Sequence, residues 1–577
     1  MAPNTTAQRM WLTHHAERFH GFLGRLTTER AVERLWAQDA GLWTADPAVQ
    51  RAIRNRLGWL TIAQAMRPQL ERLGRLREEL REAGVTRMPL LGMGGSAFFA
   101  EVCRSLFGVA AAGIDVQVLD TTDPTAISAA RQRTPPASLG AIISSKSGST
   151  IEVQSLAAYF LDALRASGHD PAARCVVITD AGTPLEAQAK TWGVRRVFAQ
   201  GPGQGAEVGG RFSALAFFGL VPAALIGADP GHLLRRAEAM LEACAPGVPL
   251  ADNPAAQLAA LLATMRHSGQ DKLTLLVPPD LAGVGAWIEQ MIAESLGKQG
   301  QGLIPITGEP RREPSAYGRD RVFVELQVAE RWDEELDRRA RALAAAEHPV
   351  LRIHWQDRYD MGGEVMRWAV ASALAGFLLE INPFDEPNVQ ESKDRTRQLL
   401  DGLAPGQQLA ESGPPLCADG NLTVYGQPAG APPPTVADAL RGLLEGLQPS
   451  DFLAILSFLP RTETLDARLR MLRERLAAHL QPATMLQHGP RYLHSTGQLF
   501  KGGPPAGAFL VLTADEKDDL PIPGAPYTFG TLKQAQALGD VQAMRQRGRR
   551  LLHARLKRPE AALPELVRML DQATAPR

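Results

Sequence analysis

A dense group of hydroxyl-bearing residues follows a short apolar stretch in the first third of the chain. The segment Ser144–Thr150 has five hydroxyl groups in seven residues, with one lysine and one glycine. Its hydroxyls, the Lys146 ammonium and the N–H groups that open the next helix can converge on one phosphate. The alternative is a solvated loop with an ordinary N-cap, for which Ser149 or Thr150 would serve. The density of donors favours a phosphate cradle.

Two other glycine-rich turns have donors of the same kind. Leu91–Ser96 follows an expected strand and opens a helix, and its glycines let backbone N–H groups approach an anion. Gly209–Ser213 precedes an apolar helix, and Arg211 within it offers a planar fork of donors that suits an oxyanion. A tight strand-to-helix turn and a solvated arginine are the alternatives, and spacing does not decide between them.

A carboxylate that could move a proton lies on the expected helix Ala286–Leu296. Glu289 and Glu294 both fall at the edges of its apolar stripe, so periodicity does not choose between them. On spacing alone, each fits a solvated flank better than a catalytic position. A phosphate cradle together with one carboxylate nevertheless favours an enzyme that moves protons on a phosphosugar.

Composition narrows the class of protein. The 577 residues carry 62 basic and 62 acidic side chains, which gives no support to nucleic acid as the main partner. The four cysteines are far apart and form no Cys-x-x-Cys pair, as expected in a reducing compartment. No signal pattern and no apolar run of ~20 residues is evident, so we expect a cytoplasmic protein and no membrane partner.

Short apolar runs alternate with helical patterns from Met88 onward, which predicts an α/β protein with parallel sheets. Residues from Gln8 to Ala83 have the spacing of helices, and Leu403–Val436 is rich in Gly and Pro. We expect five parts: a helical N-terminal segment (1–85), two tandem αβα sandwich domains (86–250 and 251–402), a linker (403–445) and a small C-terminal α/β unit (446–577).

Four of these motifs occur in an order that resembles glucose-6-phosphate isomerase, an enzyme of two sugar-isomerase (SIS) domains. They are Gly-Met-Gly-Gly-Ser at 92–96, Ser-Lys-Ser-Gly-Ser-Thr at 145–150, Gly-Gly-Arg-Phe-Ser at 209–213 and Glu-Ser-Leu-Gly-Lys at 294–298. The similarity extends to Arg34–Trp36, Asn382–Val389 with Lys393, and Arg491–Gln498. It is strongest to the isomerase half of bacterial transaldolase–glucose-6-phosphate isomerase fusions. No transaldolase barrel is recognisable before it, so the resemblance implies a free-standing isomerase.

The resemblance implies interconversion of glucose 6-phosphate and fructose 6-phosphate through a cis-enediolate, in glycolysis and gluconeogenesis. Glu294 would be the base that moves a proton between C2 and C1, and Arg211 would stabilise the enediolate. Lys393 would assist ring opening. No metal or other cofactor is implied. The residues that would hold the sugar phosphate are Gly95, Ser96, Ser145, Lys146, Ser147 and Thr150.

Two positions depart from the family pattern. The histidine that usually opens the ring follows a glycine-rich turn, and the nearest counterpart here is Glu364 in Met361–Glu364. Ring opening would then rest with Glu364, with Lys393 or with His494, although a structural role for His494 is an equal alternative. The second departure is Glu386, which occupies the place of the family's usual glutamine.

Two other functions stay open. One is a related SIS-type isomerase acting on mannose 6-phosphate, and the other is a non-catalytic module that senses phosphosugars. Glu294, Arg211 and Lys393 together favour an enzyme, because a sensor needs the cradle but no base. The expected partner is a small phosphosugar, and the sequence leaves a homo-oligomer open.

Overall fold

A computed structural model describes residues 7–202, 207–403, 407, 409–411, 413–426 and 431–574. The chain divides into two compact units, each built from three stretches of sequence. The first unit comprises Met1–Asp120, Thr134–Thr307 and Asp320–Glu386, and the second comprises Thr121–Arg133, Gly308–Arg319 and Pro387–Arg577. Within the described residues, no helix is both long enough and apolar enough to cross a membrane.

The first sheet of the first unit is wholly parallel, with strand order β3-β2-β4-β5-β6. Its strands are β2 (Arg87–Gly92), β3 (Asp115–Leu119), β4 (Ala141–Ser144), β5 (Cys175–Asp180) and β6 (Val197–Gln200). The accompanying helices are α6 (Phe98–Phe107), α8 (Ile151–Ala166), α9 (Pro171–Arg174), α10 (Pro184–Thr191) and α11 (Phe217–Ile226). The chain leaves β2 toward β3 on one side and returns to β4 on the other. The C-terminal ends of β2 and β4 therefore flank the position where open sheets bind ligands.

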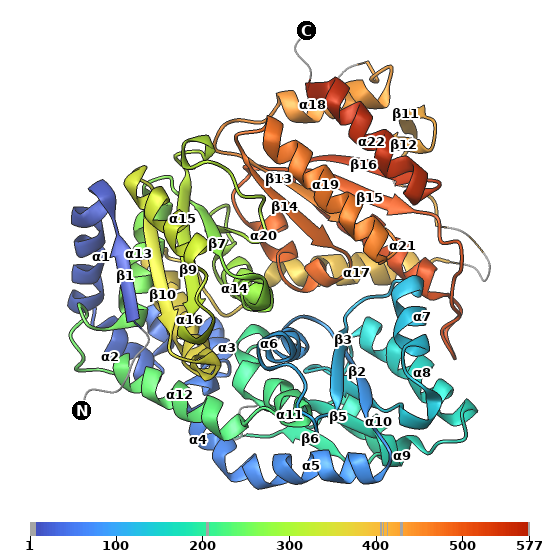
Figure 1. The fold of residues 1–577 in the computed structure, drawn as a ribbon, viewed down its shortest axis with the longest axis horizontal. Helices are drawn as coiled ribbons and strands as arrows, with labels where there is room; N and C mark the ends of the chain where they lie inside the picture. Colours follow the sequence, from blue (N-terminus) through green and yellow to red (C-terminus); the bar gives the residue numbers. More distant parts are fainter. Residues whose placement is uncertain are drawn as a thin grey trace. The chain divides into compact units, whose positions relative to one another are not determined.

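The second sheet of this unit has the order β1-β10-β9-β7-β8 and is parallel except for β1. Its parallel strands are β7 (Lys272–Leu276), β8 (Ile304–Ile306), β9 (Arg321–Val328) and β10 (Val350–Trp355). Its helices are α12 (Pro230–Ala243), α13 (Pro254–His267), α14 (Ala282–Leu296), α15 (Glu334–Ala345) and α16 (Met361–Leu378). Helix α14 packs against α6 and α16, between the two sheets (Figure 1). The mixed α/β fold with mainly parallel sheets is confirmed.

The N-terminal segment differs from the sequence expectation. It does not begin as a helix, because Ala7–Trp11 forms strand β1 and pairs antiparallel with β10, from Ala7 opposite His354 to Trp11 opposite Val350. This strand satisfies backbone groups that would otherwise be open along the edge of β10. The rest of the segment is helical, as expected: α1 (Ala16–Thr28), α2 (Ala31–Trp36), α3 (Pro47–Arg54), α4 (Ile62–Met66) and α5 (Leu70–Glu82).

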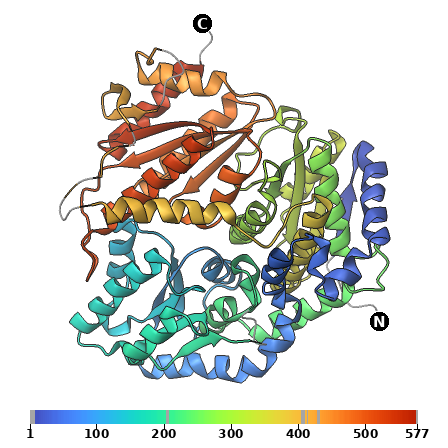
Figure 2. The ribbon, with the colours of Figure 1, turned by 180° about the vertical axis from the view of Figure 1, so that it is seen from behind.

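The second unit contains the third sheet, of order β11-β12-β16-β15-β13-β14. Four of its strands are parallel: β13 (Phe452–Ser457), β14 (Ala483–His488), β15 (Gly507–Ala514) and β16 (Arg550–Leu556). Its helices are α7 (Pro124–Gln132), α17 (Pro387–Asp401), α18 (Val436–Glu445), α19 (Glu463–His479), α20 (Gly497–Gly502), α21 (Phe529–Gln546) and α22 (Pro559–Thr574). Helices α19 and α22 cover one face of this sheet, and α17 and α21 lie on the other (Figures 1 and 2).

The stretch expected to be a linker is part of this sheet in its described portion. It forms the hairpin β11 (Pro415–Asp419) and β12 (Leu422–Tyr425), which extends the sheet beside β16, and then α18. The turn contains Gly420 with φ of 57°, directly after Asp419. An Asp-Gly pair between two short, largely apolar stretches is a hairpin signal that composition alone obscures.

Two short segments from earlier in the chain are built into the second unit. Thr121–Arg133 is held by Asp123, which accepts hydrogen bonds from Lys533 Nζ at 2.7 Å and from the Arg461 N–H at 3.0 Å. Gly308–Arg319 is held by Glu309, whose Oε1 accepts from the Thr484 N–H at 2.9 Å. The second unit is therefore assembled from three separate stretches of sequence.

Candidate active site

The two phosphate-cradle turns lie side by side at the C-terminal ends of neighbouring strands. Strands β2 and β4 pair in register, with Gly92 opposite Ser144. The Ser144 hydroxyl donates to the Ser96 carbonyl at 2.7 Å and so ties the first turn to the second. Two turns rich in donors thus meet at the ligand-binding edge of a parallel sheet.

The turn Ser145–Thr150 is organised by its own hydroxyls. Ser145 Oγ lies 3.1 Å from Thr150 Oγ1 and accepts from the Gly148 N–H at 3.1 Å, whereas Ser147 is exposed. Gly148 has a φ of 68°, which favours glycine. Thr150 is the N-cap of α8, but its side chain makes no capping hydrogen bond. The N–H groups of its first turn therefore face an uncapped end that an anion could satisfy.

Lys146, predicted to contact the phosphate, makes an ion pair with a residue of the neighbouring strand β5. Its ammonium binds the carboxylate of Asp180, at the C-terminal end of β5. Burial raises the pKa of Asp180, and Lys146 opposes this shift. The role of Lys146 in phosphate binding stays a prediction, and it would require the ammonium to be shared with Asp180.

The first turn also packs directly on the loop that carries Arg211. A Cβ atom on Gly95 would lie 2.0 Å from the Gly210 carbonyl oxygen and 2.8 Å from the Arg211 nitrogen. Ser213 Oγ donates to the Gly95 carbonyl at 3.2 Å and to that of Gly210 at 2.6 Å. Only a glycine at position 95 permits this backbone contact, which links the predicted phosphate cradle to Arg211.

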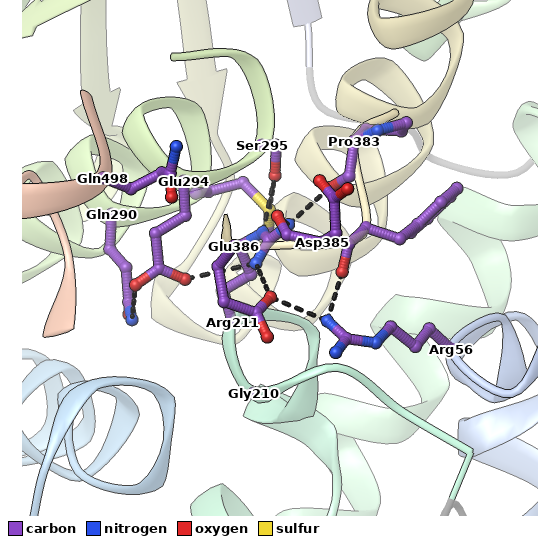
Figure 3. A network of polar contacts seen from close by, with 12 residues as sticks. Arg56, Gly210, Arg211, Gln290, Glu294, Ser295, Pro383, Asp385, Glu386 and Gln498 are labelled. Atoms are coloured by element: carbon purple, nitrogen blue, oxygen red, sulfur yellow. Dashed lines mark hydrogen bonds and ion pairs between the residues drawn. The ribbon is translucent and has the colours of Figure 1, made fainter. Parts of the chain in front are cut away.

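Arg211 is buried, with 1% of its side chain exposed, and all five of its N–H donors have acceptors (Figure 3). Nε donates to Ser295 Oγ at 2.8 Å, and Nη2 donates to the carbonyls of Pro383 at 2.5 Å and Asp385 at 3.1 Å. Nη1 donates to Glu294 Oε2 at 3.2 Å and to Glu386 Oε2 at 3.0 Å. Its guanidinium thus connects the end of α14 to the loop at 382–386.

Glu294 lies near the end of α14 and is 6% exposed. Its other oxygen accepts from Gln290 Nε2 at 3.3 Å. Burial raises the pKa of Glu294 to about 7; Arg211 opposes this shift and Glu386 adds to it. The expectation that Glu289 and Glu294 flank a solvated face is wrong, because every residue of α14 from Trp287 to Leu296 is buried. Glu289 is also 6% exposed and accepts from Thr307 Oγ1 at 3.1 Å.

The loop at 382–386 is fixed by two cations. Lys298 Nζ donates to the carbonyls of Asn382 at 2.6 Å and Asp385 at 2.5 Å, and to Asp385 Oδ1 at 2.7 Å. Burial lowers the pKa of Lys298 to about 7, Arg211 adds to this shift, and Asp385 opposes it.

The second cation is Arg56, whose Nη1 lies 2.7 Å from Glu386 Oε2. Although burial alone would raise the pKa of Glu386, Arg211 and Arg56 hold it at about 2.

Sequence reasoning missed Arg56 and gave no separate role to Lys298. Arg56 follows α3 in an arginine-rich stretch with no motif of its own, so nothing local distinguishes it. Lys298 belongs to the motif at 294–298, and its buried contacts are the signal that sets it apart.

Glu364 lies in the first turn of α16 and is not part of the cluster around Arg211. It has no exposed surface, its Oε1 is 3.1 Å from Arg367 Nε, and Trp368 Nε1 donates to its Oε2 at 3.2 Å. The glycines before it serve helix packing, because a Cβ on Gly362 would lie 2.1 Å from the Leu233 carbonyl oxygen. A carboxylate enclosed in this way cannot contact a sugar without rearrangement, so the structure gives no support to ring opening by Glu364.

Lys393 and His494 belong to the second unit. Lys393 lies on α17 and His494 in the short 3₁₀ turn Arg491–His494. Neighbouring residues of both segments meet at buried Asp540: Ser392 Oγ donates to Oδ1 at 2.9 Å, and Tyr492 OH donates to Oδ2 at 2.7 Å. The roles of Lys393 and His494 stay predictions.

Comparisons with known proteins find curated relatives and solved structures of similar fold, whereas no family model matches the chain. A glucose-6-phosphate isomerase of Thermus thermophilus is 30% identical over 396 residues, which cover 60% of this chain and 91% of the relative. A glucose-6-phosphate isomerase of Rubrobacter xylanophilus is 29% identical over 397 residues, which cover 60% of this chain and 89% of the relative.

Two solved structures share the fold. A hypothetical protein of Thermus thermophilus has a TM-score of 0.58 at 27% identity, and the match covers 69% of this chain and 100% of that protein. A glucose-6-phosphate isomerase of Chlamydia trachomatis has a TM-score of 0.54 at 16% identity, and the match covers 66% of this chain and 86% of that enzyme. At that identity, the second likeness concerns the fold alone.

Proposed function

Because this chain belongs to the glucose-6-phosphate isomerase family, we propose that it interconverts glucose 6-phosphate and fructose 6-phosphate. The single observation that carries the proposed mechanism is the buried Glu294–Arg211 pair, linked through Gly95 to the turns at the ends of β2 and β4. A proton-accepting group, a cation and an anion cradle are then joined by continuous contacts within one unit.

Glu294 is the proposed base. In open-chain glucose 6-phosphate its carboxylate takes the proton from C2; that bonding pair becomes the C1=C2 double bond, and the C1 carbonyl pair moves onto O1. The carboxylic acid then returns the proton to C1, O2 loses its proton to become the ketone oxygen, and O1 gains one. A base with a pKa of about 7 can accept and release a proton readily near neutral pH.

Arg211 is the proposed electrostatic partner of the enediolate. Because its five donors are already engaged, it would act mainly through its fixed positive charge beside Glu294. The sugar phosphate would lie against the turns at 94–96 and 145–150. Ring opening would rest with Lys393 or His494, since Glu364 is enclosed among helices.

A coupled assay tests this function directly. Purified protein receives fructose 6-phosphate, and glucose 6-phosphate is measured by the reduction of NADP⁺ in a dehydrogenase reaction, with and without a chelator. We expect turnover in both conditions, because the sequence motifs imply no metal. Mannose 6-phosphate is offered separately; a preference for it would replace glucose 6-phosphate as the substrate, and binding of all three sugars without turnover would favour a sensor.

Location and assembly complete the proposal. We place the reaction in the cytoplasm, with a free phosphosugar as the partner, because the four cysteines are free thiols, as expected in a reducing compartment. Size-exclusion chromatography with light scattering would determine whether the enzyme forms a homo-oligomer.

A further inference from the structure

Two carboxylates share one nitrogen of Arg211. Nη1 lies 3.2 Å from Glu294 Oε2 and 3.0 Å from Glu386 Oε2, so these oxygens are within about 6 Å of each other, a range in which like charges oppose each other's ionisation. Figure 3 shows the guanidinium between the two side chains. The same cation therefore serves both carboxylates.

The negative charges of the two carboxylates are not equally stabilised. Glu386 contacts two guanidinium groups, those of Arg211 and Arg56, and 33% of its side chain is exposed. Glu294 contacts the shared Arg211 and the neutral amide of Gln290, and 9% of its side chain is exposed. The negative charge of Glu386 is thus well stabilised, whereas that of Glu294 depends on a cation that it shares.

We propose that Glu386 is a positioning residue that acts through Glu294: by taking up part of the Arg211 charge, it leaves the base able to hold as well as release a proton in the neutral range. The inference rests on the proposed function, in which Glu294 carries the proton between C2 and C1. A base with Arg211 to itself would remain ionised to lower pH and would accept a proton less readily.

Five charged side chains lie around Glu294. Arg211 faces it from the turn Gly210–Leu215. From the loop at 382–386, Glu386 binds Arg211 through its carboxylate and Asp385 binds it through its backbone carbonyl. Arg56 pairs with Glu386, and Lys298 at the end of α14 pairs with Asp385. With Glu294, the cluster contains three carboxylates, two guanidinium groups and Lys298, whose own pKa is about 7. Removing the charge of Glu386 takes a negative charge away from the neighbourhood of Glu294, which favours ionised Glu294. The directions of the pKa shifts agree, since Glu386 raises the pKa of Glu294.

The test is the pH dependence of kcat/KM in matched variants. Glu386→Gln keeps the shape and removes the charge, and we expect the acid limb to move down by about one pH unit. Arg56→Gln leaves Glu386 uncompensated, and the limb should move up. Glu380→Gln is the control: this exposed carboxylate pairs with Arg25 at 3.1 Å, and its loss should leave the limb in place. The substrate phosphate titrates identically in every assay, so differences belong to the enzyme.

The double variant Arg56→Gln/Glu386→Gln should keep most of the downward shift of Glu386→Gln, because Glu294 again has Arg211 to itself and Arg56 acts through Glu386. A structural role for Glu386 alone would lower activity by the same factor at every pH, and an unmoved limb in a folded, active Glu386→Gln enzyme overturns the inference. A thermal melt shows whether Glu386→Gln folds. If it does not, Arg56→Gln is the test: an acid limb that this variant leaves in place or lowers also overturns the inference.

A readout without turnover separates this inference from the proposed function. Glutamate labelled with ¹³C at the side-chain carboxyl reports the titration of Glu294, and its resonance is assigned with Glu294→Gln. An inactive parent protein would overturn the proposed function, yet the resonance would still report whether Glu386→Gln lowers the titration midpoint. An active parent with the same midpoint in both proteins would overturn the inference alone.

Discussion

Glu289 and Glu294 lie five residues apart on α14 and are equally buried, but their partners differ. Glu294 contacts the Arg211 guanidinium, and Glu289 accepts from the Thr307 hydroxyl. We predict that Glu294→Gln lowers kcat by about a thousandfold or more, because the amide cannot take the C2 proton. Glu289→Gln keeps an acceptor for Thr307 and should be nearly silent. Steady-state kinetics of both variants decides; an inactive Glu289→Gln enzyme would mean that the wrong carboxylate has been chosen.

The phosphate cradle should act on affinity. Ser147→Ala with Thr150→Ala removes two hydroxyl donors, each worth about 1.5–3 kcal/mol when it binds an anion. A large rise in KM with a smaller change in kcat is expected. Ser149→Ala is the matched control, since this exposed hydroxyl donates to Ser147 Oγ and is not among the predicted phosphate ligands. An unchanged KM in the double variant would mean that the phosphate binds elsewhere.

Among the contacts between elements, that of Gly95 with the Arg211 loop leaves the least room for a side chain. We predict that Gly95→Ala destabilises the protein by about 1–3 kcal/mol and displaces Arg211, because the new methyl group would overlap the Gly210 carbonyl. Gly210→Ala is its control, since a Cβ there meets nothing within 4 Å. Thermal melts and kcat/KM of the two variants should diverge. Equal tolerance at both positions would show that the two turns can separate at little cost.

The elements that carry the phosphate turns were predictable because each is local. An apolar strand followed by small, polar residues and a helix has a signature within a dozen residues, as at Ala141–Ile151. Contacts between segments that are far apart in the sequence have no such local signature. Strand β1 forms because β10 offers an edge. The second half of α14, from Trp287 to Leu296, is wholly buried because neighbouring elements cover it, which amphipathicity cannot reveal. Arg56 likewise gains its role only when Glu386 is placed beside it.

At the scale of the whole molecule, Asp123 in the first third of the sequence stabilises Lys533 near its end. Lys533 is 3% exposed in its side chain and pairs with Asp123 and Glu516. We predict that Asp123→Asn destabilises the second unit by about 3 kcal/mol, because breaking a buried pair leaves a poorly compensated charge. Hydrogen exchange should rise in α21. Asp115→Asn, which removes a pair with half-exposed arginines on β2 and α6, should cost about 1 kcal/mol or less. Unchanged exchange in α21 would contradict this assignment.

The second unit is not encoded by one continuous stretch of the gene, so it could not be transferred to another gene as a single segment. Codons 387–577 transferred to another gene would carry most of the third sheet, but they would leave behind Asp123 and Glu309. Asp123 and Lys533 are 410 positions apart, yet they form one buried pair, so we expect a substitution at one to alter the selection on the other. In an alignment of relatives, we therefore expect segments 121–133 and 308–319 to covary with their contacts after 460. Recombination within the gene should be tolerated poorly between positions 134 and 460, because it separates these partners.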